Sequence, residues 1–536
     1  MHLIDQHTKG IMEECKARAK DAGLRFDDDS LEYIVTNKDM IELSPKVMIP
    51  TLYDYWVNDV EVLKEIGKYK LYPNNPYETV INSRPAISFY NDNNPDWMNI
   101  MIFYHVLAHI DFFQNNRMFE HTWGDDFVGQ ALADKRLIAN LRSEHGRWVD
   151  YAIEFSRGIN NLNGYYRELY RRNFPQDNEP PTRVGFYFGK FLQDIEKISD
   201  TQYYKEVERY NELIGIHGED LAESIFFEDL KTKYPEFQTK YSSHLKKLED
   251  AVESVDLIEF IRDNSPFLRK EANRWIKLVM SIVRNTAVYF EPQIRTKIIN
   301  EGWASYWHDT LFLQDDRIKG HEVSYARLNA GVTALQRGGL NPYAIGLRLM
   351  QYVEDLGDKG KLQYQFQQMA GIDARANYDG KVQNGRKAIF DLRTHFSDFT
   401  LIKTFVDQDF VDEHDLFVLG QRLDPQRQVY QYYVKSRRAE DYQQMLINSL
   451  YHPPAMQVDV ERTHDKCLYI KHLFEGKPLI PDFIADTMLG IEYLWGAPVK
   501  LDTFDVVASR DEDAPPEVTP VRYTMKNRQL SKEVLN

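Results

Sequence analysis

Apolar residues recur three and four positions apart over most of the first 390 residues, a spacing that predicts α-helix. The pattern is clear from Pro95 to Arg172, which has few internal prolines. It returns in a helix that we expect to begin near Pro292, since proline suits a first helical turn, and to run to about Leu313. The sequence therefore predicts a mostly helical domain over residues 1–390.

The hydrophobic period changes toward the C-terminus, where apolar and polar residues alternate in short runs bounded by turn residues. We predict strands at Met456–Val460, Cys467–Phe474 and Val499–Phe504, and a helix at Asp482–Trp495. Together these elements predict a small α+β domain over residues 395–508. The expected fold class is mainly α with a small C-terminal α+β domain.

Two stretches are too polar to supply a core of their own. Charged side chains dominate residues 175–280, which follow a linker-like Gln176–Pro181 segment, and we interpret them as an insertion of exposed, solvated helices. The acidic and proline-containing start of residues 509–536 predicts a disordered tail.

Composition excludes several functional classes. The 536 residues carry 66 Lys+Arg and 82 Asp+Glu, a net charge of −16, which argues against a nucleic-acid binder and against attachment to anionic lipid. The two cysteines, Cys15 and Cys467, cannot make a disulfide framework, and they fit a reducing compartment. The first twenty residues resemble no signal peptide, and no run approaches the roughly 18 apolar residues of a spanning helix. We expect a soluble cytoplasmic protein without membrane insertion.

The sharpest chemical signal is the histidine pair in His105-Val-Leu-Ala-His109. Residues four apart on a helix project from one face, so two neutral imidazoles at this spacing can share one metal ion, as they do in HExxH zincins. An isolated pair of this kind also arises by chance or for structural reasons.

A second segment, Asn300-Glu301-Gly302-Trp303-Ala304-Ser305-Tyr306-Trp307-His308, strengthens the signal. Glu301 and His308 are two helical turns apart and so share a face. Zinc hydrolases with two histidines and one glutamate take their third ligand from a later helix, which predicts a zincin-like helical core binding a divalent metal ion, zinc by this donor set. The alternative is a structural one, with Glu301 salt-bridged to Arg295 or Lys297 and His308 a core histidine.

Val106 occupies the position where zincins carry their general base, and valine cannot accept a proton from water. Two arrangements stay open. In one, His105, His109 and Glu301 bind the metal and the base lies elsewhere. In the other, His105, His109 and His308 bind it and Glu301 is the catalytic base, so that Glu301 and His308 are the candidate catalytic residues.

At these residues the chain resembles the SpoVR family, the stage V sporulation protein R-like proteins of bacteria and archaea. The matching segments are Thr79–Ser83, His105–Asn116, Tyr289–His308, Asn341–Gly346 and Leu494–Val499. The similarity extends from about residue 10 to 508 and is weak across 120–280.

The resemblance implies a role of the spore-cortex or stress-response type. It also implies two partners, a PrkA-like serine protein kinase and a von Willebrand factor A-like protein, whose genes commonly neighbour those of the family. Two functions remain open: a metal-dependent hydrolase acting on a peptide, an amide or cell-wall material, and a non-enzymatic regulatory or scaffold protein that works with these partners.

Overall fold

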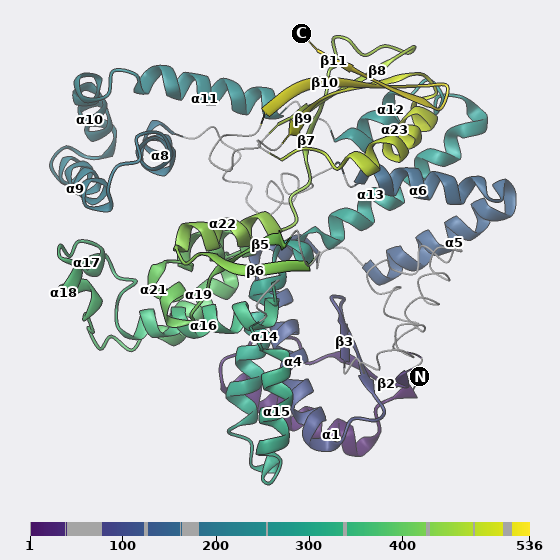
Figure 1. Cartoon of the computed structure of the whole chain (residues 1–536). Helices are drawn as coiled ribbons and strands as arrows, with labels where there is room; N and C mark the ends of the chain where they lie inside the picture. Colours follow the sequence, from purple (N-terminus) through teal and green to yellow (C-terminus); the bar gives the residue numbers. More distant parts are fainter. Residues whose placement is uncertain are drawn as a thin grey trace. The chain divides into compact units, whose positions relative to one another are not determined.

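The structure is a computed structural model of the chain (Figure 1), and its described residues are 2–37, 39, 78–122, 127–160, 162, 182–252, 256–335, 340–424, 429–474, 477–507 and 517–535. It is mainly helical with a C-terminal sheet region, as the sequence predicts. Two compact units are present. The larger holds Met1–Leu169, Asp256–Tyr352 and Phe390–Asn536, and the smaller holds Tyr170–Val255 and Val353–Ile389. None of the described helices is long and apolar enough to cross a membrane.

The smaller unit is built from helices around a core of aromatic side chains. Its first segment forms α8 (Arg183–Phe186), the π-helix η4 (Tyr187–Ile195), α9 (Asp200–His217), α10 (Glu219–Lys233) and α11 (Phe237–Val252). Its second segment includes α17 (Tyr364–Gln367), α18 (Ile372–Ala376) and the first part of α19 (Gly385–His395). Tyr187, Phe191 and Phe226 are fully buried in its core. The first segment of this unit ends at Val255, so the insertion expected at 175–280 extends beyond it. The remaining helices of the unit come from its second segment, later in the chain.

A four-stranded sheet near the N-terminus is absent from the sequence expectations. Its order is β1-β2-β4-β3, with β2 and β4 parallel and the outer pairs antiparallel. The strands are β1 (His2–Leu3), β2 (Ser30–Val35), β3 (Glu78–Ile81) and β4 (Ala86–Asn91), and α1 (Gln6–Asp21) lies between β1 and β2. These strands are two to six residues long, and the paired strands β2 and β4 are far apart in sequence, so local periodicity gives little sign of the sheet.

The larger unit is centred on two helices, α4 (Asp96–Asn115) and α14 (Lys297–Phe312), which lie side by side (Figure 1). Most residues of both helices are buried, as expected for helices enclosed in a core. Asp111 of α4 accepts a hydrogen bond from the indole N–H of Trp303 on α14 at 2.9 Å. Asp111 is fully buried, and the guanidinium of Arg393 lies 3.5 Å away. This polar contact ties the two helices together.

Helix α14 begins after the position that the sequence suggests. Pro292 lies inside the preceding helix α13 (Arg274–Arg295). The helical conformation is interrupted at Thr296, and α14 starts at Lys297. The carboxylate of Asp398 accepts hydrogen bonds from the backbone N–H groups of Ile298 and Ile299, both at 2.9 Å. A helix start needs such acceptors for its unpaired N–H groups. The expected start at Pro292 was wrong. The acceptor that fixes the true start, Asp398, lies a hundred positions away in the sequence and has no local signal.

A close backbone approach fixes α14 against α16 (Pro342–Asp358). A Cβ atom on Gly302 would lie 2.4 Å from the carbonyl carbon of Gly346, and one on Gly346 would lie 2.3 Å from the carbonyl oxygen of Ile298. Neither distance is tolerable, so the two helices touch at a point where only glycine fits on both sides.

The C-terminal sheet has the order β11-β10-β9-β8-β7. The strands are β7 (Ala455–Val458), β8 (Leu468–Leu473), β9 (Val499–Val507), β10 (Glu517–Lys526) and β11 (Gln529–Val534). Helix α23 (Pro481–Trp495) connects the parallel strands β8 and β9, and the helices that share the apolar core of the sheet are α5 (Phe127–His145), α6 (Trp148–Asn160), α12 (Leu257–Asn264) and α13. The strands and the helix near 456–504 therefore lie close to where the sequence predicts them.

The disordered tail expected at 509–536 is not what the structure shows for its described part. Strands β10 and β11 form an antiparallel hairpin there, and β10 pairs with β9 along nine residues. Val521 and Met525 of β10 enter the apolar core. Their contribution is easily missed because they alternate with polar residues, whereas the acidic residues 511–513 dominate the local composition.

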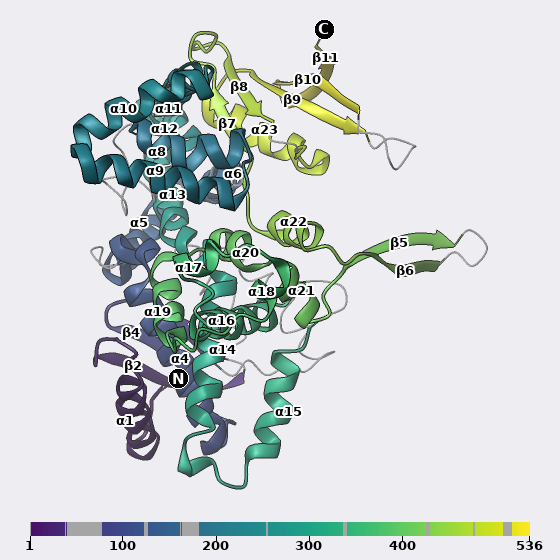
Figure 2. The same ribbon diagram turned by 90° about the vertical axis from the view of Figure 1, so that its left-hand side faces the viewer.

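Short helices and one hairpin complete the larger unit. They are η2 (Arg117–Thr122), η5 (Glu271–Asn273), η6 (Asp316–Ile318), α15 (Glu322–Val332), α20 (Asp398–Phe405), α21 (Gln408–Glu413), α22 (Ala439–Ser449), β5 (Val418–Asp424) and β6 (Val429–Ser436). The β5–β6 ribbon projects from the neighbouring helices (Figure 2).

Replacing Gly302 with alanine should destabilise the protein by about 1–3 kcal/mol, because an added methyl group must push α14 away from α16. Urea unfolding measures the change. Gly10→Ala in α1 is the matched control, since its Cβ meets nothing within 4 Å and alanine favours a helix by about 0.5–1 kcal/mol. Equal stability of the two variants would contradict the close approach.

Replacing Asp111 with alanine should destabilise the protein by roughly 3–5 kcal/mol, because it leaves the buried Arg393 guanidinium without its carboxylate. The exposed Asp391 of α19 provides the control, and Asp391→Ala should stay within about 0.5 kcal/mol of the parent. Thermal and urea unfolding of both variants test the expectation. A near-neutral Asp111→Ala would show that the pair does not hold the helices.

Candidate metal centre

The predicted residues of the two motifs meet between α4 and α14. His105 and His109 lie on one face of α4, and Glu301 of α14 faces them. The Nε2 atoms of the two histidines are 3.1 Å apart. The Oε2 atom of Glu301 lies 3.8 Å from Nε2 of His105 and 3.5 Å from Nε2 of His109. All three residues are buried, and they form the one group of three metal-ligating residue types found within metal-binding distance among the described residues.

The outer nitrogens of the histidines contact polar groups that fix their protonation. His109 Nδ1 lies 2.9 Å from the amide oxygen of Asn300, so this nitrogen carries the hydrogen. His308 Nε2 lies 3.2 Å from the amide oxygen of Asn329, whose NH₂ group in turn donates to Asp309. His308 is therefore protonated at Nε2, and its Nδ1 is an acceptor.

His105 completes this chain of assignments. Its Nδ1 lies 3.0 Å from the acceptor Nδ1 of His308, so His105 carries its hydrogen there. When both rings are neutral, His105 and His109 therefore present an unprotonated Nε2 toward Glu301. The carboxylate Oε2 atom has no hydrogen-bond partner among the described residues. Three electron-pair donors thus face one another in a buried space.

The distances match what one ion would require. A tetrahedral zinc ion with ligand bonds of about 2.0–2.1 Å holds its ligand atoms roughly 3.3 Å apart. The three separations of 3.1, 3.5 and 3.8 Å lie around that value. Such centres are usually made of carboxylate ligands and of imidazole ligands whose second ring nitrogen is hydrogen-bonded.

Burial and electrostatic attraction together set the charge of the groups at the site. Burial lowers the pKa of His105 far below its ordinary value and that of His308 to about 4, which keeps both rings neutral. Burial opposes charge on His109 and Glu301 as well, but their mutual attraction prevails, raising the pKa of His109 and lowering that of Glu301. The site therefore favours an anionic Glu301 that attracts positive charge.

The alternative partners of Glu301 are only partly present. Lys297 Nζ lies 3.6 Å from the Oε1 atom of Glu301, whereas Arg295 pairs with Glu291 at 2.8 Å. Lys297 is largely exposed and contacts the other carboxylate oxygen, so it leaves Oε2 unpaired. His308 is buried and hydrogen-bonded as a core histidine would be.

Two residues at the site escape sequence reasoning. Glu78 begins β3, and burial raises its pKa to about 7 while its charge interacts with those of His109 and Glu301. The ring of Tyr343, at the start of α16, stacks on His105 with centroids 6.2 Å apart. Glu78 directly precedes the family-like Thr79–Ser83 segment, which was the available signal. Val106 is fully buried in the core.

Comparison with known proteins agrees with the motifs. The sequence profile described as SpoVR like protein matches residues 5–452. The chain is also similar to the uncharacterized protein YcgB of Escherichia coli (strain K12), with 22% identity over 498 residues that cover 88% of this chain and 86% of that protein. No solved structure matches. The resemblance found in the sequence is confirmed, and the chain belongs to the SpoVR family.

Proposed function

We propose that His105, His109 and Glu301 hold one divalent metal ion and that this zincin-like centre supports hydrolysis of a peptide or amide. The observation that carries the proposal is the meeting of three buried metal-ligating groups, two imidazoles and one carboxylate, within metal-binding distance of one another. Such an arrangement is repulsive unless a cation occupies it. Two imidazoles and one carboxylate favour zinc among the common divalent ions.

In this proposal Glu301 is a ligand and His308 is a positioning residue. His308 contacts Nδ1 of His105, the nitrogen opposite the one that faces Glu301. It therefore orients the His105 ring from behind, and Asn300 does the same for His109. This favours the arrangement with two histidines and Glu301 over the one with three histidines.

Glu78 takes the role of general base that Val106 cannot fill. It is a carboxyl group contributed by a different element, and its charge interacts with both His109 and Glu301. A metal ion bound here would lower the pKa of a coordinated water molecule, and a neighbouring carboxylate would accept its proton. The chain's own groups thus supply orientation, charge and a proton acceptor.

Metal content tests the ligand assignment. Purified without a histidine tag, the parent chain should carry about one zinc ion, and Glu301→Gln should lose most of it because a neutral amide replaces an anionic donor. His308→Ala should retain metal with affinity weakened about 10–100-fold, the usual effect of removing an outer partner. Elemental analysis and competition with a chromogenic chelator measure both.

Glu291→Gln is the matched control, since Glu291 is a buried glutamate paired with Arg295. It should keep the parent's metal content. A parent chain without stoichiometric metal would overturn the proposal, and loss of metal from His308→Ala but not from Glu301→Gln would favour the three-histidine arrangement.

Measurement of turnover tests the second part of the proposal, the hydrolysis of a peptide or amide. Assayed with a library of peptide and amide substrates, Glu78→Gln should bind metal normally and lose activity at least 100-fold, as expected for loss of a general base. Should the metal-loaded parent cleave nothing, the fully buried Val106 favours the second candidate: a regulatory or scaffold protein with a structural metal, acting with a PrkA-like serine kinase and a von Willebrand factor A-like protein. Co-purification with that kinase would test this role.

A further inference from the structure

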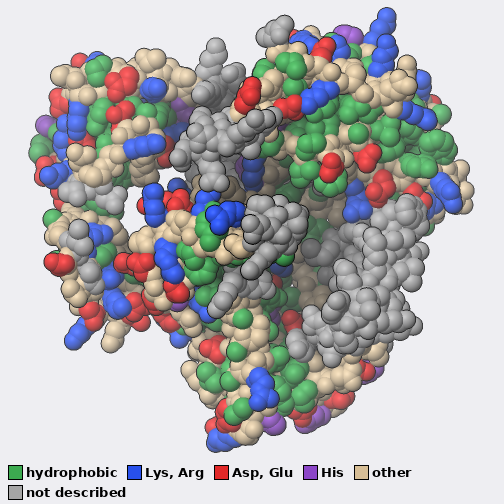
Figure 3. All heavy atoms as spheres, in the orientation of Figure 1, with side chains coloured by type: hydrophobic (Ala, Val, Ile, Leu, Met, Phe, Trp, Pro, Cys, Tyr) green, Lys and Arg blue, Asp and Glu red, His purple; other side chains and the backbone are tan. Residues whose placement is uncertain are grey.

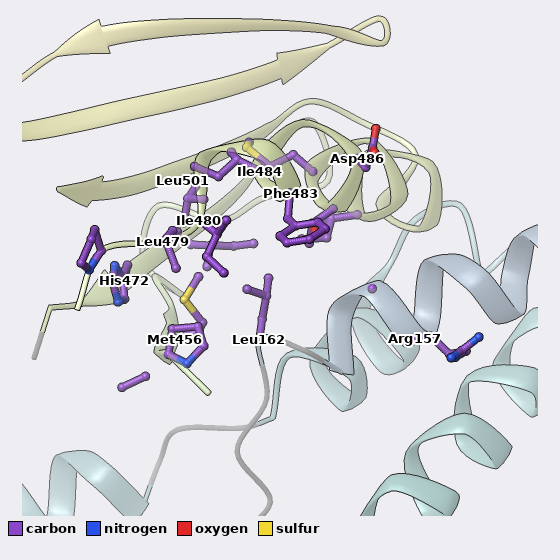
Figure 4. A pocket seen from close by; sticks show the side chains of 18 of the residues that line it. Arg157, Leu162, Met456, His472, Leu479, Ile480, Phe483, Ile484, Asp486 and Leu501 are labelled. Atoms are coloured by element: carbon purple, nitrogen blue, oxygen red, sulfur yellow. The ribbon is translucent and has the colours of Figure 1, made fainter. Parts of the chain in front are cut away.

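A cavity of about 980 Å³ lies between α6, α23 and the β7–β8–β9 edge of the C-terminal sheet (Figure 4). Its size is at the upper end of the range for small-molecule sites. All of its lining residues belong to the larger unit. The metal centre uses none of them.

The interior of this cavity is apolar. Ile470 and Leu501 from the sheet and Ile484, Met488 and Ile491 from α23 are buried around it. Figure 4 shows Met456, Leu162, Ile480 and Phe483 around the same space, with the lining residues Arg157 and Asp486 at its periphery. An apolar interior of this size suits a ligand whose main part is hydrocarbon.

The mouth of the cavity is apolar as well, which is unusual for a surface. Ile480 and Phe483, at the start of α23, are 61% and 64% exposed. Hydrophobic side chains gather on the face formed by this part of the chain (Figure 3). Exposed apolar side chains that gather in one patch are a usual mark of an interaction or ligand-binding site.

Basic side chains gather at one end. His452 precedes β7, His472 ends up opposite Met456 in the β7–β8 register, and Lys477 follows β8. All three therefore lie at the end of the hairpin where β7 begins and β8 finishes. Of the acidic lining residues, Glu154 is on α6 and paired with Arg157 at 3.2 Å, and Asp486 is a turn further along α23. Lys477 supplies the positive charge at the hairpin end, and its ammonium group also donates to the backbone carbonyl of Asn448 at 3.1 Å.

We propose that this cavity binds a long-chain carboxylate, with its hydrocarbon chain inside and its anionic head beside Lys477 and the two histidines. Ile480 and Phe483 cover the part of the chain nearest the mouth. The ligand is held by burial of apolar surface, and the basic end selects its charge.

Fluorescence of a dansylated undecanoate probe tests the proposal on the full chain. We expect saturable one-to-one binding that oleate displaces. Ile480→Glu should weaken probe binding at least tenfold, because a carboxylate replaces apolar surface at the mouth, and Lys477→Glu should weaken it at least fivefold through charge reversal. Phe483→Glu is a second mouth variant.

Val460→Glu is the matched control, since Val460 is 66% exposed and lies outside the cavity lining. It should bind the probe like the parent. No saturable binding by the parent, or equal binding by Ile480→Glu and Val460→Glu, would overturn the proposal. If oleyl alcohol displaced the probe as effectively as oleate, the proposed requirement for an anionic head group would be wrong.

The same acyl chemistry could come from a free acid or from a membrane lipid. Co-sedimentation with phosphatidylglycerol vesicles distinguishes them. We expect none, because the chain carries a net charge of −16, whereas oleate should still displace the probe. Vesicle binding that Ile480→Glu abolishes would assign the acyl chain to a lipid instead.

Discussion

Two imidazole nitrogens and one carboxylate oxygen face one another between α4 and α14, and their electron pairs repel unless a proton or a metal ion lies among them. This electrostatic constraint organises the centre of the larger unit. Protons are disfavoured on His105, whose outer nitrogen already holds one for His308 and whose burial opposes a second. The Glu301 carboxylate raises the pKa of His109, but its Oε2 atom lies 3.5 Å from Nε2, longer than the 2.7–2.9 Å of a charge-assisted hydrogen bond.

The rest of the unit is arranged so that this meeting of groups is rigid. Asp398 caps the start of α14 one turn before Glu301, and the Gly302–Gly346 contact sets its distance from α16 directly beside that residue. Asp111 fixes α4 two residues after His109 by its bond to Trp303. Three independent constraints therefore lie within about a turn of the proposed ligand atoms. A site that must keep ligand atoms within a few tenths of an ångström benefits from such support.

Sequence reasoning identified His105, His109 and Glu301 because helical spacing is a local property, and the family-like segments linked the two helices. The C-terminal strands and α23 were equally accessible, since each has its own short-range period. What it missed depends on distant partners. Asp398 decides where α14 begins, and β2 pairs with β4 across more than fifty residues. Glu78 joins the site through such a strand, so neither periodicity nor spacing could reveal it.

This arrangement explains why position 106 holds a valine and not a glutamate. In a zincin helix the residue after the first histidine must reach the metal-bound water, which requires that side of the helix to face an open cleft. Here Val106 is fully buried, and a glutamate at that position would place a charge in the core at a cost of several kcal/mol. The carboxylate must then come from outside the helix pair. Strand β3 ends the sheet next to β4, and the charge of its Glu78 interacts with those of His109 and Glu301, so the proposed centre includes a residue of the N-terminal sheet. The proposed chemistry thus depends on the sheet as much as on the two helices that carry the ligands.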